Sequence, residues 1–358
     1  MTTLPLNTSA TCAELESGQT TTPPCTLCCC GLVNRTLAVG FMVSLAFAIV
    51  VGNMITLTVF LQTKQSRTPQ GYLKVSLAVA DMMVGVFVVP FSIYTEVSLM
   101  VTNSPPSWYK RGSTFLGEWL RSWQPCMLIG PVFAVCTFVS ITTIFLMTVE
   151  RSVAILWPLR KDTLVTRRRT LLLVVLSWTF SVLLALAPLI FSSNFTLEYD
   201  ECSRMCIYTP LNPQLSANSH VLLLFPAFDF TLLSGTLAVN IVSFTSIRRY
   251  TKMRELLSET SPNGGGCCKR PTLSDIKVAK TICILTLTFT ASFTPIAVFV
   301  LGNVVGYTWC NFSFIAFWIL ACNSCCNVII YSVRDQRFRK GVTLLFQREH
   351  SPPQGEKI

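Results

Sequence analysis

The chain has 358 residues, of which 51% are hydrophobic and only 13% are charged. This composition excludes an ordinary soluble globular protein of the same length and indicates a membrane protein. The formal net charge of +11 indicates topology and contact with anionic lipids rather than binding to nucleic acid.

The sequence contains seven apolar stretches that can each cross a bilayer, which takes about 20 residues per helix. In chain order they cover residues 38–62, 73–97, 125–151, 170–192, 219–247, 275–303 and 312–333. Residues 1–37 form a tail, residues 38–333 form the bundle, and residues 334–358 begin as an amphipathic helix. The predicted fold is an all-α membrane protein, a seven-transmembrane helix bundle with a short amphipathic eighth helix.

The distribution of basic residues predicts the orientation, because Lys and Arg gather on the cytoplasmic side. With the N-terminus outside, only five of the 28 basic residues fall in outer segments. We therefore expect residues 1–37 to be extracellular and residues 334–358 to be cytoplasmic. Glycosylation sequons fall in the same outer segments. They begin at Asn7, Asn34, Asn194 and Asn311.

Ionisable residues inside spans cost roughly 2.5 to 3.5 kcal/mol on insertion scales, so each suggests a function. The clear cases are Asp81, Asp229 and the pair Glu150 and Arg151. Polar residues of other spans can accompany the Asp81 carboxylate, in a set suited to a hard monovalent cation or a proton. Hydrogen bonding between helices is the alternative. This polar set is Asn53, Ser140, Asn323, Ser324 and Asn327.

Several motifs occur in order along the spans: Gly52-Asn53, SLAVAD ending at Asp81, Cys126 at the start of the third span, and Glu150-Arg151-Ser152 near its end. Trp178, Pro295 and NVIIY (residues 327–331) follow. Together they resemble the rhodopsin-like (class A) G-protein-coupled receptors over residues 40 to 342. The chain departs from that pattern at Ser152, Phe293, Val328 and Ser234.

The resemblance implies a multi-pass receptor of the plasma membrane that activates a heterotrimeric G protein. Arg151 would be tied to Glu150 and to Asp275 until the sixth helix moves outward, and Leu159 and Tyr331 would take part in coupling. The polar set around Asp81 would hold a sodium ion, with no other cofactor. Cys126 would form a disulfide with Cys206 or Cys202.

The second span is similar to that of biogenic-amine receptors, but Phe133 stands where those receptors carry the acid that binds the amine. We therefore expect a lipid-like or uncharged small ligand, or constitutive activity. Glu96 is the acid that could still serve an amine ligand. No Lys occurs in the seventh span, which excludes a retinal Schiff base. The expected pocket residues are Phe133, Thr137, Asn218, Ser219, Phe293, Ile296, Ala297, Phe317 and Trp318.

Other functional classes have weaker support. The chain has two histidines, His220 and His350, and no nucleophile, metal or phosphate-binding motif, so we do not expect an enzyme. An ion transporter or channel using Asp81 and Asp229 is the main rival hypothesis. A receptor-like scaffold that does not signal is the other.

Overall fold

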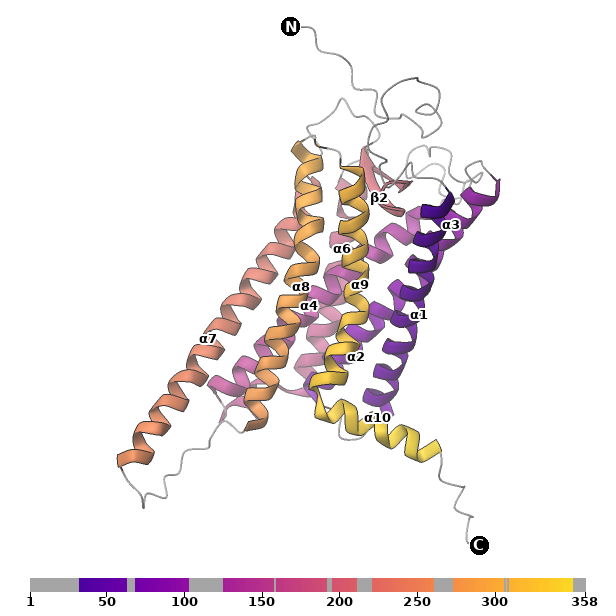
Figure 1. Cartoon of the computed structure of the whole chain (residues 1–358). Coiled ribbons are helices and arrows are strands. Elements are labelled where there is room, and N and C mark those ends of the chain that lie inside the picture. Colours follow the sequence, from indigo (N-terminus) through magenta and orange to yellow (C-terminus); the bar gives the residue numbers. More distant parts are fainter. Residues whose placement is uncertain are drawn as a thin grey trace.

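Seven helices long and apolar enough to cross a membrane lie along one another in the computed structural model (Figure 1). The structure describes residues 32–62, 68–102, 125–157, 159–191, 195–210, 221–260, 273–305, 307 and 309–349. Within these ranges the seven predicted spans are confirmed. Four spans are single helices whose ends lie within six residues of the predicted apolar stretches: α1 (Leu32–Gln62), α4 (Cys126–Leu156), α6 (Arg167–Phe191) and α9 (Cys310–Arg334). Residues 32–37, predicted as part of the tail, belong to α1.

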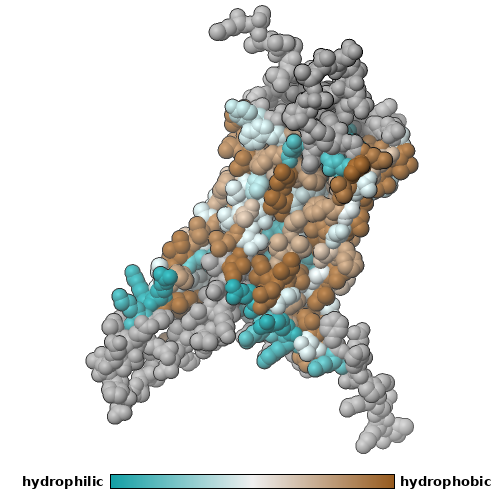
Figure 2. Space-filling model, viewed as in Figure 1, coloured by the Kyte–Doolittle hydropathy of each residue, from teal (hydrophilic) through white to brown (hydrophobic). Residues whose placement is uncertain are grey.

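The fifth span continues well beyond its predicted apolar stretch, which ends at residue 247, whereas the sixth agrees with its predicted stretch to within two residues. The fifth span forms α7 (Leu224–Thr260), and the sixth forms α8 (Leu273–Val305). The short α5 (Lys161–Leu164) lies between α4 and α6, and the amphipathic α10 (Gln336–Glu349) follows α9. Figure 2 shows apolar side chains over the middle of the visible face, with hydrophilic ones toward its lower end near α7 and α10. This banding is the surface expected of a helix bundle in a bilayer.

The second span contains a wider helical turn. It consists of α2 (Pro69–Met83), the π-helix η3 (Val84–Val88) and α3 (Val89–Thr102). Pro90 is the second residue of α3, and a proline lacks the N–H that a regular α-helical turn would use. A Cβ added to Gly85 would come within 2.7 Å of Ile49 Cγ2. Only glycine therefore allows α1 to lie this close to the π-turn.

A β-hairpin covers one end of the bundle, hereafter the hairpin end. Strands β1 (Phe195–Asp200) and β2 (Met205–Pro210) pair antiparallel, with Asp200 opposite Met205. Phe195, Leu197 and Tyr199 alternate along β1 and are buried, so one face of the hairpin packs on the helices. These strands were not predicted from the sequence.

The opposite end, hereafter the α10 end, is closed by a small apolar cluster. Val59, Phe60, Tyr331 and Phe338 pack together there, and α10 runs across the end of the bundle (Figure 1). Packing of Phe338 against α1 and α9 orients the amphipathic helix that the sequence predicts.

Candidate functional site

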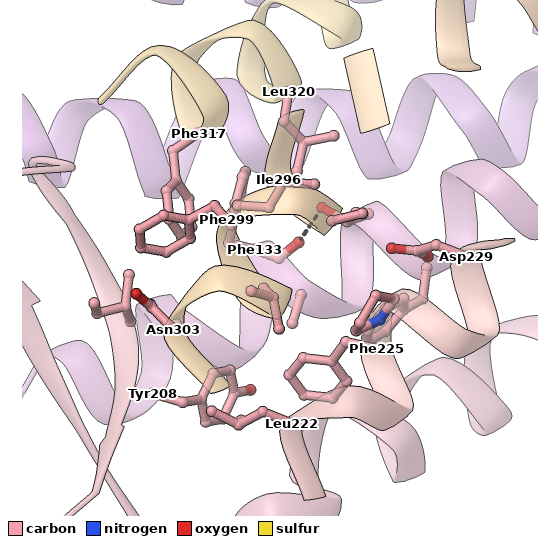
Figure 3. A pocket seen from close by; sticks show the side chains of 18 of the residues that line it. Phe133, Tyr208, Leu222, Phe225, Asp229, Ile296, Phe299, Asn303, Phe317 and Leu320 are labelled. Carbon is pink, nitrogen blue, oxygen red and sulfur yellow. Dashed lines mark hydrogen bonds between the residues drawn. The ribbon is translucent and has the colours of Figure 1, made fainter. Parts of the chain in front are cut away.

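A cavity lies among α4, α7, α8 and α9, beside the hairpin (Figure 3). Its empty volume is about 840 Å³, including the part open to solvent. Hairpin residues 206–208 line one side of it. Five of the residues expected from the sequence line it as well: Phe133, Thr137, Ile296, Ala297 and Phe317.

The other expected pocket residues are placed differently. Phe293 is 1% exposed and stacks on Phe289, with ring centroids 5.7 Å apart, so it packs inside the bundle. Trp318 is also buried, and its Nε1 donates a hydrogen bond to the carbonyl oxygen of Ser203, 2.9 Å away. Neither residue lines the cavity as the structure describes it. Asn218 and Ser219 lie outside the described residues.

Aromatic rings form much of the cavity wall. The Phe317 ring lies between those of Phe299 and Phe133, at centroid distances of 5.6 and 6.2 Å. On the α7 side, the Phe225 ring contacts that of Tyr208 at 5.4 Å. The Tyr208 hydroxyl donates to the Ala185 carbonyl oxygen, and burial raises the pKa of this phenol. The hydroxyl therefore stays protonated, and its proton is already used in the hydrogen bond to Ala185.

One carboxylate, that of Asp229, belongs to the cavity wall. Asp229 lies on α7 and is 6% exposed. Its Oδ1 is buried without a hydrogen-bond partner. Thr137, which also lines the cavity, donates its hydroxyl proton to the Phe133 carbonyl oxygen at 2.8 Å. Asp229 is thus the charged group of the described wall, and its Oδ1 has unused binding capacity.

Two disulfides attach the hairpin to the helices. Cys206 bonds Cys126 at the start of α4, which selects one of the two pairings implied by the sequence motifs. Cys202, in the hairpin turn, bonds Cys310 at the start of α9. These two bonds hold the hairpin over the cavity at two different helices.

The hairpin turn also inserts a charge between the spans. Arg204 is 3% exposed and adopts a left-handed backbone conformation with φ of 56°. Its Nη1 lies 3.6 Å from Oε2 of the buried Glu96 on α3. The Tyr199 hydroxyl donates to Glu96 Oε1 at 2.9 Å, and burial followed by the Glu96 charge raises the pKa of this phenol. Glu96 therefore binds two hairpin residues, Arg204 and Tyr199, and it does not line the cavity.

A second group of polar side chains lies deeper in the bundle. Asp81 is 1% exposed, and its Oδ2 accepts a hydrogen bond from Asn327 Nδ2 at 2.8 Å. Asn53 Nδ2 donates to the carbonyl oxygens of Ile49 and Ser324. The amide oxygens of Asn323 and Asn327 are buried without a hydrogen-bond partner. Asn327 thus contacts Asp81 directly, Asn53 is linked to Ser324, and the amide oxygens of Asn323 and Asn327 remain open acceptors.

Comparison with known proteins identifies the family. The model of the family described as "7 transmembrane receptor (rhodopsin family)" matches residues 52–331. The chain belongs to this receptor family. The family consists of signalling receptors rather than enzymes, and its bundle is the one found here.

Individual relatives of this receptor are distant. It is 24% identical to "Rhodopsin, GQ-coupled" of Mizuhopecten yessoensis over 84% of its own chain and 56% of the relative. It is 25% identical to "Trace amine-associated receptor 9" of Rattus norvegicus over 84% of each. It is also 32% identical to "Neuropeptide receptor 22" of Caenorhabditis elegans, over 46% of its own chain and 35% of that protein. The chain thus spans 35% of the neuropeptide receptor and 56% of the GQ-coupled rhodopsin, but 84% of the trace amine-associated receptor.

In this receptor, the predicted charge pair lies near the α10 end of α4. Arg151 Nε and Glu150 Oε2 are 3.8 Å apart, and Glu150 is buried. Ser152 forms a hydrogen bond with Ser243 of α7, with 2.6 Å between the two hydroxyl oxygens. The serine that departs from the family motif therefore links α4 directly to α7. Leu159, just beyond α4, is 84% exposed and available to a partner.

Tyr331 of the receptor is held in the cluster at the α10 end. It is 2% exposed, and its ring lies 6.2 Å from the Phe338 ring. The Lys74 ammonium lies 4.8 Å from the centre of the Tyr331 ring and forms an ion pair with Asp335. A buried cation thus fixes Tyr331 between α2 and the start of α10.

Some of the predicted residues, or their side chains, lie outside the part of the chain that the structure describes. Asn7 and Asn194 lie outside the described residues, as does the side chain of Asp275, which belongs to α8. Asn34 lies in the first turn of α1.

Proposed function

We propose that this receptor transmits a signal from a ligand bound in the cavity to heterotrimeric G proteins. The observation that carries the proposal is the separation of two sites along one bundle. The cavity lies beside the hairpin end, whereas Glu150 and Arg151 lie near the end of α4 that faces α10. Helices α4, α7 and α8 reach from one site toward the other, so their relative movement can couple the two.

The proposed orientation places the hairpin end outside the cell and the α10 end in the cytoplasm of a plasma-membrane receptor. Basic residues support this, because Arg167, Arg168 and Arg169 begin α6 at the α10 end and such clusters favour the cytoplasmic side. The disulfides of the hairpin support it too, because they form in an oxidising compartment.

Replacing Arg151 with Ala is expected to reduce nucleotide exchange on G proteins to the level of receptor-free nanodiscs. The reason is that Arg151 is the cation that outward movement of α8 would release toward the partner. Replacing Asp275 with Ala is expected to raise basal exchange, because Arg151 would lose the second of its two acidic partners. The measurement is GDP release from a panel of purified heterotrimeric G proteins, with the receptor in lipid nanodiscs.

The matched control is Arg168→Ala, which removes an exposed arginine at the same end of the bundle. It is expected to leave exchange unchanged. If wild type accelerates exchange on no member of the panel, the proposed coupling is wrong. Ion flux through wild-type proteoliposomes in that case would instead favour the transporter hypothesis.

We also propose that the polar set around Asp81 binds a sodium ion. A buried carboxylate beside uncharged oxygens suits a hard monovalent cation, and the open amide oxygens of Asn323 and Asn327 fit that need. Ser140 and Ser324 would complete the oxygen set. Among the described residues, no group of three His, Cys, Asp or Glu side chains is placed to hold a metal, so a multivalent transition metal has less support.

Sodium is expected to stabilise the receptor, and Asp81→Asn is expected to abolish that effect. At a sodium concentration 100 times the dissociation constant, the stabilisation would be about 2.7 kcal/mol. The measurement is the Tm of purified receptor in NaCl against KCl at equal ionic strength. Glu198→Gln, which changes a carboxylate of the hairpin, serves as the control. Equal Tm values in the two salts for wild type would contradict the sodium site.

A further inference from the structure

Asp229 is the one charged residue among the described residues of the cavity wall, and the coupling proposed above does not use it. In Figure 3 it lies at one side of the cavity, away from Phe299 and Phe317 on the other side. It lies eight residues into the fifth span, which begins at Val221, so it is roughly 12 Å below the end of that span. A carboxylate at this depth is costly unless something compensates its charge.

The described cavity wall supplies no compensating charge. It contains no Lys, Arg or His, and Oδ1 of Asp229 has no hydrogen-bond partner. An isolated charge in such surroundings is strongly disfavoured, so the carboxylate either takes up a proton or pairs with a cation from outside the chain. A ligand cation would gain most from this site, because it would meet an acceptor that no protein group occupies.

Two other buried acids of the spans, Glu96 and Asp81, are not available in the same way. Glu96 lies beside Arg204 and accepts the Tyr199 hydroxyl, and Asp81 accepts the Asn327 amide. Neither of them lines the cavity. Glu96, the acid that could have served an amine ligand, is therefore engaged, whereas Asp229 lines the cavity with an Oδ1 that has no hydrogen-bond partner.

The rest of the wall restricts the kind of cation. The rings of Phe133, Phe225, Phe299 and Phe317 favour an apolar or aromatic body, and ring faces also attract ammonium groups. Asn303, on the same side of the cavity as Phe299 in Figure 3, adds one amide for a polar substituent. Without a basic residue in the described wall, a carboxylate or phosphate on the ligand would have no counter-ion.

We propose that the cavity binds a hydrophobic organic ammonium ligand, with the Asp229 carboxylate as the counter-ion of its ammonium group. The aromatic body of the ligand lies against Phe133, Phe299 and Phe317. The proposal rests on the function proposed above, because it names the ligand class of the same cavity. It replaces the uncharged ligand that was expected because Phe133 of α4 stands where biogenic-amine receptors carry an acid. In this proposal Asp229 of α7 supplies the acid instead.

The test uses the purified full-length receptor in nanodiscs and three matched series of probes. These are phenylalkylamines with two to six methylene groups, the corresponding primary alcohols, and the corresponding carboxylic acids. The Tm is measured against probe concentration for wild type, Asp229→Asn and Asp229→Leu. The control variant is Glu198→Gln, which changes a carboxylate outside the cavity wall.

At least one amine is expected to raise the Tm of wild type and of Glu198→Gln, whereas the matching alcohol and acid have little effect. Asp229→Asn and Asp229→Leu are expected to weaken this amine by at least about 30-fold, because its ammonium would be buried without a counter-ion. Without probe, Asp229→Asn is expected to be at least as stable as wild type, since Oδ1 has no partner to lose.

Three results would overturn the proposal. They are no stabilisation of wild type by any amine, equal stabilisation of wild type and Asp229→Asn, and a marked loss of Tm in Asp229→Asn without probe. The last result would reveal a structural partner for the carboxylate. The G-protein assay is independent of these measurements. Amine binding through Asp229 in a receptor that activates no G protein would contradict the proposed coupling and leave the ligand class standing.

Discussion

Replacing Arg204 with Met is expected to lower the free energy of unfolding by about 3 to 5 kcal/mol. The change would leave the Glu96 carboxylate buried without its charge partner, 3% exposed at the side chain. Arg204 itself lies over the Phe314 ring at 5.4 Å, which Met can partly replace by apolar contact. The Tyr199 hydroxyl would remain as a hydrogen-bond donor to Glu96, but one neutral donor does not compensate a desolvated charge.

The double variant Glu96→Gln with Arg204→Met is expected to regain much of the lost stability. Removing both charges removes both desolvation costs, and a buried ion pair often contributes little net stability compared with neutral groups of similar size. Gln keeps an acceptor for Tyr199. The two residues therefore interact strongly in a double-mutant cycle even if the pair as a whole is nearly neutral.

Thermal unfolding of the purified receptor variants measures this cycle. Arg168→Met is the control, because Arg168 is exposed, and it is expected to change stability little. Single and double variants that all unfold at the wild-type temperature would show that the ion pair does not hold the hairpin turn. An additive loss in the double variant would show that Glu96 and Arg204 act through separate contacts.

The spans could be predicted because each one corresponds to a continuous apolar stretch of the sequence. A run such as residues 125–151 is apolar on every face, and α4 (Cys126–Leu156) follows it closely. The apolar run does not mark where a helix ends, however. Beyond residue 247, α7 continues through Arg248, Arg249 and further to Thr260, because a polar segment of good helix-forming residues can extend a helix outside the bilayer.

The hairpin was missed although part of its signal is present. Phe195, Leu197 and Tyr199 alternate with polar residues, as in a strand with one buried face. Strands this short have little independent stability. The disulfides to α4 and α9 and the Arg204–Glu96 contact attach this hairpin to the helices, and all of these join residues far apart in the chain.

The wall of the cavity was predicted in part for a related reason. Motif spacing placed Phe133, Thr137 and Phe317 in the cavity wall correctly as positions on helices. It also identified Asp229 as a costly residue, but it could not show which side of α7 faces the cavity. That depends on how α7 is rotated against α4 and α8. The orientation of α7, which directs Asp229 to the cavity, is therefore the reason that the proposed ligand is cationic rather than uncharged.

Removing the Cys126–Cys206 disulfide by the double change Cys126→Ser and Cys206→Ser is expected to lower stability and weaken ligand binding together. The bond closes a loop with a sequence separation of 80 residues, for which the chain-entropy model gives about 4.5 kcal/mol. Cys206 and its neighbours Ile207 and Tyr208 form part of the cavity wall. Releasing strand β2 from α4 would therefore displace one wall of the ligand site.

The second disulfide provides a matched comparison, because Cys202–Cys310 closes a loop of similar size with a separation of 108 residues. Changing both of these cysteines to Ser is expected to lower the Tm by a similar amount, but to weaken the stabilising amine less, because neither residue lines the cavity. Cys322→Ala, which changes a free cysteine of α9, controls for loss of a thiol. Equal loss of amine binding in both disulfide variants would mean that the whole hairpin, rather than strand β2 alone, shapes the site.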